Sequence, residues 1–223
     1  MSSPACNTGC WDYWRADRLQ WLPELGIGWY PVSAQPYDAG YWDHYRALDL
    51  TPCGSALTAM RIALVARHWA GTVVDIGIGG GRFVEQRGKA GPTFGFDINP
   101  HAIQWLIEND AWCDPFRWLP GLPGGLPVEA ITCWDSLEHI ADPGALIAWV
   151  KRFVFVSLPI FVDAADALAS KHYKPAEHCW YFTRTGLARF MDGCGFAMIE
   201  SNAMEQAAGR EQIETFVFER VRP

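Results

Sequence analysis

Residues 73–82 read VVDIGIGGGR, and this stretch decides the fold. The β-branched run 72–76 is short and bounded by glycines, which is typical of a buried strand. The glycines after it permit a sharp turn and a close approach of the backbone to a ligand. Asp97 lies 20 residues after Gly77, at the end of a second predicted strand, 93–97. A carboxylate there can accept hydrogen bonds from both hydroxyls of a ribose, so the pattern predicts an adenosine-type site on a Rossmann-like fold.

The segment before this strand predicts a helix that begins after Gly54 and ends before Gly71. Ser55 can cap the start of this helix. We expect Arg61 and Arg67 to point outward, because the apolar side is formed by Leu57, Met60, Ala63 and Leu64.

Strands and helices continue to alternate along the chain, which predicts a doubly wound α/β fold with ligand sites at the carboxyl ends of its strands. Asn99 and Asp142 mark the starts of helices, and the Pro/Gly-rich segment 114–127 predicts a loop. The remaining predicted elements are a helix near 82–87, strands at 130–134 and 153–158, a helix at 183–191, and strands at 195–201 and 212–219. No crossover helix separates the last two strands, so we expect them to pair antiparallel.

The aromatic residues divide the chain into two parts. Five of the 12 tryptophans and five of the seven tyrosines fall between Trp11 and Tyr45, whereas the first phenylalanine is Phe83. We therefore expect an irregular, aromatic-rich extension at 1–53, with a short helix near 39–48, before an α/β domain at 54–223. Two roles stay open for the extension: a lid over the site, or large side chains that attach it to the domain.

Charge and composition narrow the class of protein. The net charge of −7 over 223 residues disfavours nucleic acid as a partner. No run approaches the ~20 apolar residues of a membrane span, and the N-terminus does not resemble a secretory signal. Seven scattered cysteines suit a reducing cytoplasm. Cys6, Cys10 and Cys53 lack a second close pair or a nearby histidine, so we predict no metal site.

The glycine loop also distinguishes between adenosine cofactors. A dinucleotide site has a third glycine where this chain has Arg82, and Asp75 would receive a pyrophosphate poorly. These two residues disfavour an NAD(P)-dependent oxidoreductase and favour a cationic ligand.

Four motifs in order resemble the class I S-adenosylmethionine-dependent methyltransferases, over about residues 54–220. The first two are Asp75 with the three alternate glycines of the loop, and Asp97 at the end of the second strand. The third, WDSLEHIADP at 134–143, and the fourth, EHCWYFT at 177–183, look like the small-molecule and ubiquinone-biosynthesis-like subgroup. The resemblance implies a Rossmann-like, doubly wound, mostly parallel seven-stranded sheet with an antiparallel C-terminal strand pair.

The resemblance also implies roles for individual residues. The cofactor-binding residues would be Asp75, Gly77, Gly79, Gly81, Asp97, Ile98, Asp114, Phe116, Asp135 and Ser136. His172, Tyr173, Trp180 and Tyr181 would lie over the acceptor, with His178 or His139 as a general base. Structural interpretations stay open for three of these residues: Asp97 as an acid that closes a strand, Ile98 as core, and His139 as a loop residue.

The implied function is methyl transfer from S-adenosylmethionine to a small-molecule acceptor by in-line displacement. The protein then mainly positions and desolvates the reactants. Two alternatives stay open: a non-catalytic binding or assembly module with the same fold, and a methyltransferase that acts on nucleic acid or protein.

Overall fold

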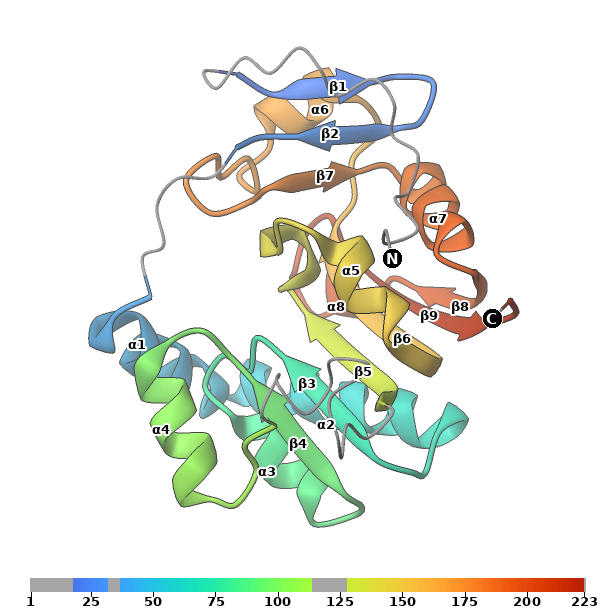
Figure 1. The fold of residues 1–223 in the computed structure, drawn as a ribbon. Coiled ribbons are helices and arrows are strands. Elements are labelled where there is room, and N and C mark those ends of the chain that lie inside the picture. The colour runs from blue at the N-terminus through green and yellow to red at the C-terminus, as the bar shows by residue number, and fades with distance from the viewer. Residues whose placement is uncertain (1–17, 32–36, 114–127, 223) are drawn as a thin grey trace.

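The main sheet has six strands in the order β4-β3-β5-β6-β9-β8 (Figure 1). The computed structural model describes residues 18–31, 37–113 and 128–222. The strands are β3 (Val73–Ile76), β4 (Thr93–Phe96), β5 (Val128–Trp134), β6 (Val150–Pro159), β8 (Phe196–Asn202) and β9 (Ile213–Arg220). Strands β3 to β6 are parallel, while β9 pairs antiparallel with both β6 and β8. The predicted mostly parallel sheet with an antiparallel C-terminal pair is confirmed.

The outer edge of the sheet, beside β4, differs from the expected seven strands. Among the described residues, the place of the seventh strand holds one parallel bridge, between Gly95 and Trp112. The predicted loop at 114–127 follows this bridge and lies outside the described residues.

The helices begin where capping side chains are available. They are α1 (Ala39–Asp49), α2 (Pro52–His68), α3 (Arg82–Gly88), α4 (Pro100–Glu108), α5 (Pro143–Ala148), α6 (Ala164–Ala169), α7 (Arg184–Gly193), α8 (Met204–Ala207) and the 3₁₀ turn η2 (Leu137–His139). Asn99 and Asp142 cap α4 and α5, as predicted. Helix α2 begins earlier than predicted, because Thr51 accepts a hydrogen bond from the Gly54 amide and Pro52 fits the first helical position.

The alternation of side chains along each strand builds a core on both faces of the sheet. Val73 and Ala130 point to one face and pack with residues of α2 and α3. Val74 and Ile131 point to the other face and pack with residues of α5 and α7. Because both faces are covered by helices, the strands read as near-continuous apolar runs.

Helix α2 presents a different face to the core from the one expected. Thr58, Leu64 and Val65 are buried, whereas Ala63 is exposed. Arg67 points outward as predicted, with 55% of its side chain exposed, but the prediction for Arg61 is wrong, because only 16% of its side chain is exposed. Arg61 lies three residues from both Thr58 and Leu64, so helical periodicity turns it inward, where carboxylates compensate its charge.

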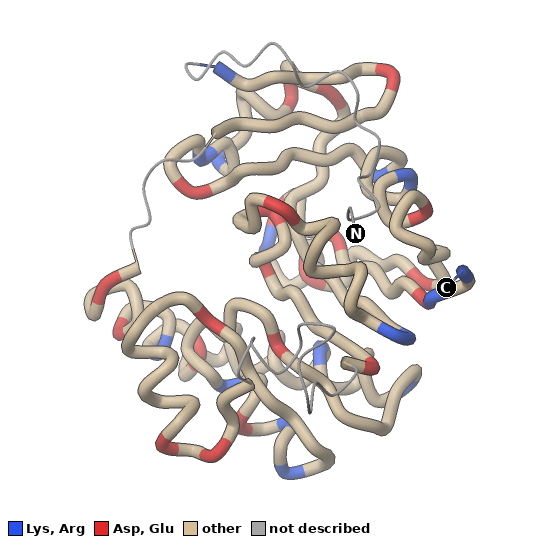
Figure 2. Tube along the Cα trace, in the orientation of Figure 1, with Lys and Arg blue, Asp and Glu red and all other residues tan. Residues whose placement is uncertain are grey.

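Charged residues of both signs are spread along the described trace (Figure 2). Among the described residues, no helix has the length and the apolar character needed to cross a membrane.

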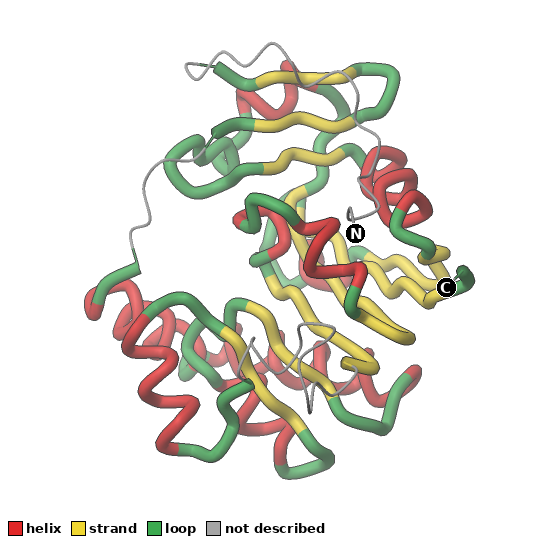
Figure 3. Tube along the Cα trace, viewed as in Figure 1, coloured by secondary structure: helices red, strands yellow, loops and turns green. Residues whose placement is uncertain are grey.

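A second, three-stranded antiparallel sheet lies at one end of the molecule, beside α6 (Figure 3). It consists of β1 (Gln20–Leu22), β2 (Ile27–Trp29) and β7 (Trp180–Phe182), in the order β1-β2-β7. The sequence predicted an irregular extension here and missed all three strands. Strands of three residues are too short to show a period. They form because β2 pairs with β7, about 150 residues later in the chain.

Candidate active site

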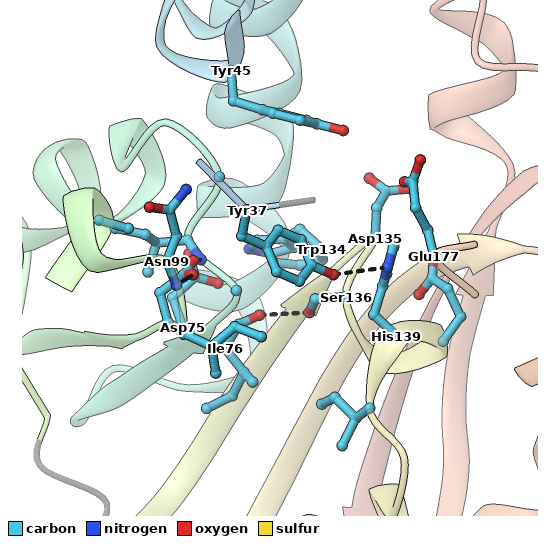
Figure 4. A pocket seen from close by; sticks show the side chains of 18 of the residues that line it. Tyr37, Tyr45, Asp75, Ile76, Asn99, Trp134, Asp135, Ser136, His139 and Glu177 are labelled. Atoms are coloured by element: carbon cyan, nitrogen blue, oxygen red, sulfur yellow. Dashed lines mark hydrogen bonds between the residues drawn. The ribbon is translucent and has the colours of Figure 1, made fainter. Parts of the chain in front are cut away.

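A cavity of about 640 Å³ opens at the carboxyl ends of β3, β4 and β5 (Figure 4). This is the edge of a doubly wound sheet at which ligands bind. Its walls come from the glycine loop after β3, the start of α4, the turn η2 and the segment 172–179. Three tyrosines at and before α1 close the remaining side.

The glycine loop turns in a way that L side chains rarely adopt. Gly77 and Gly79 have φ angles of 73° and 55°, and both line the cavity. A Cβ atom on Gly77 would lie 2.7 Å from Cβ of Ser136. The Ser136 hydroxyl donates a hydrogen bond to the carbonyl of Ile76, which fixes the loop against the end of β5. The loop therefore needs glycine at this point for both conformation and space.

Asp97 joins the loop to the start of α4. Its Oδ2 accepts a hydrogen bond from the Ile78 amide at 2.9 Å, and its Oδ1 accepts one from the Asn99 amide at 2.8 Å. Burial raises the pKa of this carboxyl, while the amide hydrogen bonds oppose that rise. Ile98, beside it, is 49% exposed and lines the cavity, so it is not a core residue.

Asp75 lies near the glycine loop, buried to 1% exposure, and lines the cavity. Its Oδ1 accepts a hydrogen bond from the Thr132 hydroxyl at 2.6 Å. Burial raises the pKa of Asp75 to about 7, even though the Thr132 hydrogen bond lowers it. The site therefore has a carboxyl that is partly protonated near neutral pH.

A row of three aromatic rings lies along the cavity, formed by Tyr37, Tyr41 and Tyr45. Ring centroids lie 5.1 Å apart for Tyr37 and Tyr41 and 4.6 Å apart for Tyr41 and Tyr45. Burial, followed by the charge of Glu177, raises the pKa of Tyr37 to about 12, so its phenol stays neutral. In the described part of the extension, these three tyrosines line the cavity, whereas Tyr30 packs against the cluster of Phe161 and Tyr181, and Trp42 is buried in the core beside α4.

A network of four charged side chains supports the end of β5. Arg61 contacts Asp135 at 3.1 Å and Glu205 at 2.8 Å, and Arg210 contacts the same two carboxylates. Burial favours protonation of Asp135, but Arg210 and Arg61 outweigh it and hold its pKa below the usual value. Asp135 also has a φ of 56°, a left-handed conformation that aspartate tolerates. The network fixes the carboxylate at the edge of the cavity.

Two histidines and a glutamate form a cluster at the other end of the cavity. The rings of His139 and His178 meet edge to face, with centroids 4.6 Å apart. Burial lowers the pKa of both histidines, so they are neutral near pH 7. Glu138 is 2% exposed, and burial together with Asp135 raises its pKa well above the usual value. The Tyr37 hydroxyl lies 3.4 Å from Nδ1 of His139.

The structure brings most of the sequence-predicted residues to this cavity. The described lining includes Asp75, Gly77, Gly79, Asp97, Ile98, Asp135, Ser136, His139, His172 and His178. The Nε2 atom of His172 lies 2.9 Å from the carbonyl of Glu211, so this ring is held at the rim. Asp114 and Phe116 lie outside the described residues.

Four predicted site residues lie elsewhere in the described structure. Gly81, with a φ of 83°, is the N-cap of α3, where a Cβ atom would lie 2.7 Å from the Trp105 ring. Tyr181 is fully buried, and Tyr173 packs against it. The Trp180 indole donates a hydrogen bond to the carbonyl of Ile140 at 2.9 Å. The last three residues pack in and around β7, a strand that the sequence did not predict.

Sequence reasoning missed the tyrosine row and the two arginines. Tyr37, Tyr41 and Tyr45 recur every fourth residue, which is a helical spacing that could have placed them on one face. Arg61 could have been found from its place three residues from two buried positions of α2. Arg210 has no comparable signal, because only the folding of the segment between β8 and β9 brings it to Asp135.

Comparison with known families identifies the domain that carries this cavity. Residues 54–201 match the family model described as a methyltransferase domain. A search of curated proteins gave no match.

Solved structures share the fold at low sequence identity. Magnesium protoporphyrin IX methyltransferase from Synechocystis PCC 6803, with bound S-adenosylhomocysteine, aligns with a TM-score of 0.55 and 16% identity over 82% of this chain and 95% of that one. The 1,6-didemethyltoxoflavin-N1-methyltransferase of Burkholderia thailandensis aligns with a TM-score of 0.52 and 15% identity, covering 88% and 96%. The N-methyltransferase NodS of Bradyrhizobium japonicum WM9, with bound S-adenosylhomocysteine, aligns with a TM-score of 0.55 and 11% identity, covering 81% and 97%.

The family match spans about two thirds of the chain, and its boundaries enclose the glycine loop, Asp97 and the segment that follows β5. The chain belongs to the methyltransferase domain family, with the class I, S-adenosylmethionine-dependent fold.

Proposed function

We propose that this protein transfers a methyl group from S-adenosylmethionine to a small-molecule acceptor bound in the same cavity. One observation carries the proposal: a single cavity of about 640 Å³ runs from the glycine loop and Asp97 to the histidine cluster. A volume of this size is within the range of about 300–1,000 Å³ that is typical of small-molecule sites.

The residues at the glycine-loop end fit an adenosine-type ligand. At Gly77 and Gly79 the loop backbone borders the cavity without a side chain between it and a ligand. The Asp97 carboxylate accepts amide hydrogen bonds from the loop and from the start of α4, and its two oxygens together offer about four acceptor positions, so acceptor capacity is left for a ribose hydroxyl. Ile98 offers an apolar surface to a base, and Asp75 lines the same cavity, where its ionised form would favour a cationic ligand. Asp135 and Ser136 would border the amino-acid part.

S-adenosylmethionine supplies an activated methyl group, since the loss of methyl from a sulfonium leaves a neutral thioether. The task of the chain is to bind and orient the two molecules and to exclude water. The tyrosine row supports this role, because neutral phenols cover the cavity without offering a phenolate that could compete with the acceptor for the methyl group. We therefore assign 37–49 to the cover of the site and residues 54–223 to the catalytic domain.

The acceptor would bind between the tyrosine row and the histidine cluster. His139 and His178 are the candidates to accept a proton from an acceptor that must lose one, because both are neutral and line the cavity. The net charge of −7 and the mixture of charges along the described trace favour a small molecule over nucleic acid. The similar enzyme from Burkholderia thailandensis holds 1,6-didemethyltoxoflavin together with S-adenosylhomocysteine, which is consistent with such a site on this fold.

Calorimetric titration with S-adenosylhomocysteine tests the cofactor half of the proposal. We expect one binding site per chain, and we expect Asp97→Ala to weaken binding by about 1–3 kcal/mol, roughly 5- to 150-fold, for a lost charge-assisted hydrogen-bond pair. Asp43→Ala, an exposed acid on α1, is the matched control and should bind normally. Equal affinities for the Asp97 variant and the wild type would refute the ribose assignment.

Transfer of labelled methyl groups into fractionated host extract tests the acceptor half. Label in the low-molecular-weight fraction supports the proposal. Label only in protein or nucleic acid would contradict it.

A further inference from the structure

The cluster of Glu138, His139 and His178 has the composition of a metal site. Each residue offers one ligand atom, and these atoms all lie within 4.8 Å of one another. Ligand atoms at about 2.1 Å from a common ion are at most about 4.2 Å apart. In a tetrahedral site the ligand atoms are about 3.4 Å apart, so these pairs need to close by at most about 1.4 Å, which side-chain rotations can supply.

The carboxylate of Glu138 gives a second and independent indication. Glu138 is 2% exposed and lines the cavity. Among the described residues, its Oε2 atom is buried and has no hydrogen-bond partner. Burying a polar oxygen without a partner is costly, so such atoms call for a ligand or an ion that the site would bind.

The surroundings of the cluster suit a cation. Glu177 and Asp135 lie close enough to exert an electrostatic effect on His139, and the Tyr37 hydroxyl lies 3.4 Å from its Nδ1 atom. Lys174 lies in the same segment, 172–179, as His178 and Glu177. Its Nζ atom is 3.6 Å from Oε2 of Glu177, which partly neutralises its charge. Contacts of this kind orient histidine ligands in metal sites.

We propose that Glu138, His139 and His178 bind a divalent first-row transition-metal ion at the acceptor end of the cavity. Two imidazole nitrogens and one carboxylate oxygen favour Zn²⁺, Fe²⁺, Mn²⁺ or Co²⁺ over Mg²⁺ and Ca²⁺, which prefer oxygen ligands. Three protein ligands leave at least one coordination position open. The ligands line the cavity, so that position faces the space where a substrate would bind.

This assignment gives the cluster a specific role that rests on the proposed methyl transfer. The open position would hold an oxygen or nitrogen atom of the acceptor, orient it, and lower the pKa of its proton. Phenols, enols and hydroxamates that chelate or ligate metals are then the favoured acceptor class. In that case the histidines are ligands and not the general base.

Metal binding is measurable without any acceptor. The purified full-length protein is treated with a chelator, dialysed, and titrated with Co²⁺ by visible absorption and with Zn²⁺ by calorimetry. We expect one ion per chain and a Co²⁺ spectrum that is typical of mixed nitrogen and oxygen ligands. Glu138→Gln and His178→Ala should each weaken binding by at least about 100-fold, because loss of an outer partner alone already costs 10- to 100-fold.

Asp43→Asn is the matched control, because it removes an exposed carboxylate of α1 and leaves all three ligands and their neighbours unchanged. We expect it to change the metal affinity by less than about threefold. Binding that is absent in the wild type, or that is equally strong in Glu138→Gln, would overturn the proposal. S-adenosylhomocysteine is titrated into the same samples, so that loss of the metal site and failure of the cofactor site are read separately.

Discussion

Arg61→Met tests whether the charged network at the end of β5 holds the fold together. The substitution leaves Glu205, which is 2% exposed, with Arg210 as its remaining ion-pair partner. Asp135 likewise loses Arg61 and keeps Arg210. Methionine has a similar length and helix propensity, so the change removes the charge with little effect on helix α2 itself.

The expected cost follows from burial. Removing one partner of a buried ion pair costs about 3–5 kcal/mol, and the second arginine reduces that loss. The Arg61 guanidinium also lies 5.1 Å from the centre of the Trp134 ring, a contact worth about 0.5–1 kcal/mol. We therefore expect a loss of about 3 kcal/mol in the free energy of unfolding. For a chain of this length, that lowers the Tm by about 6–12 °C.

Arg67→Met is the matched control on the same helix. Arg67 pairs with Glu200 at the surface, with 55% of its side chain exposed, so its loss should cost less than about 1 kcal/mol. Urea unfolding of the two variants, together with Glu205→Gln and the double variant of residues 61 and 205, gives the coupling energy directly. Equal stabilities for the Arg61 and Arg67 variants, or a coupling energy near zero, would refute the network as a buried support.

Three further predictions concern the cavity. Gly77→Ala places a Cβ atom 2.7 Å from Cβ of Ser136 at a φ of 73°, so we expect a loss of about 2–4 kcal/mol in urea unfolding and at least tenfold weaker S-adenosylhomocysteine binding. Gly88→Ala, on helix α3 with open space around its Cα, should instead be neutral or stabilise by up to about 1 kcal/mol. Burial raises the folded-state pKa of Asp75 from 3.8 to about 7, so the folded protein holds that proton more tightly than the unfolded chain. The free energy of unfolding should therefore fall as pH rises between these values, by at most about 4 kcal/mol. Asp75→Asn should flatten the curve of unfolding free energy against pH, and an unchanged slope would contradict the burial argument. Tyr45→Ala removes the ring nearest to the glycine loop and should weaken S-adenosylhomocysteine binding by about fivefold in calorimetry, whereas unaltered binding would mean that the ring does not cover the cofactor end.

The alternating pattern of strands and helices could be predicted because it depends on neighbouring residues. A buried strand, a capping Asn99 and a glycine loop each follow from the sterics and hydrogen bonds of a few consecutive residues. The acid at the end of β4 followed in the same way, since chain order alone places residue 97 beside the loop. The structure places both at the cavity.

The sequence was less informative where a residue depends on partners that are distant along the chain. The prediction for Arg61 was wrong because an arginine beside apolar residues is usually exposed, and only the carboxylates of Asp135 and Glu205 allow it to turn inward. Trp180 and Tyr181 matched a motif, but their side chains are used by a strand that forms only through pairing with β2.

The sequence by itself determined the class I fold and the glycine-loop end of the cavity, because those features are encoded in short segments with strong local constraints. Tertiary structure decided the other end, at the histidine cluster. There Glu138 and His178, 40 residues apart, meet beside a row of tyrosines from the other half of the chain. No local sequence pattern specifies these contacts, because they depend on which surfaces of the domain remain exposed once the core has formed.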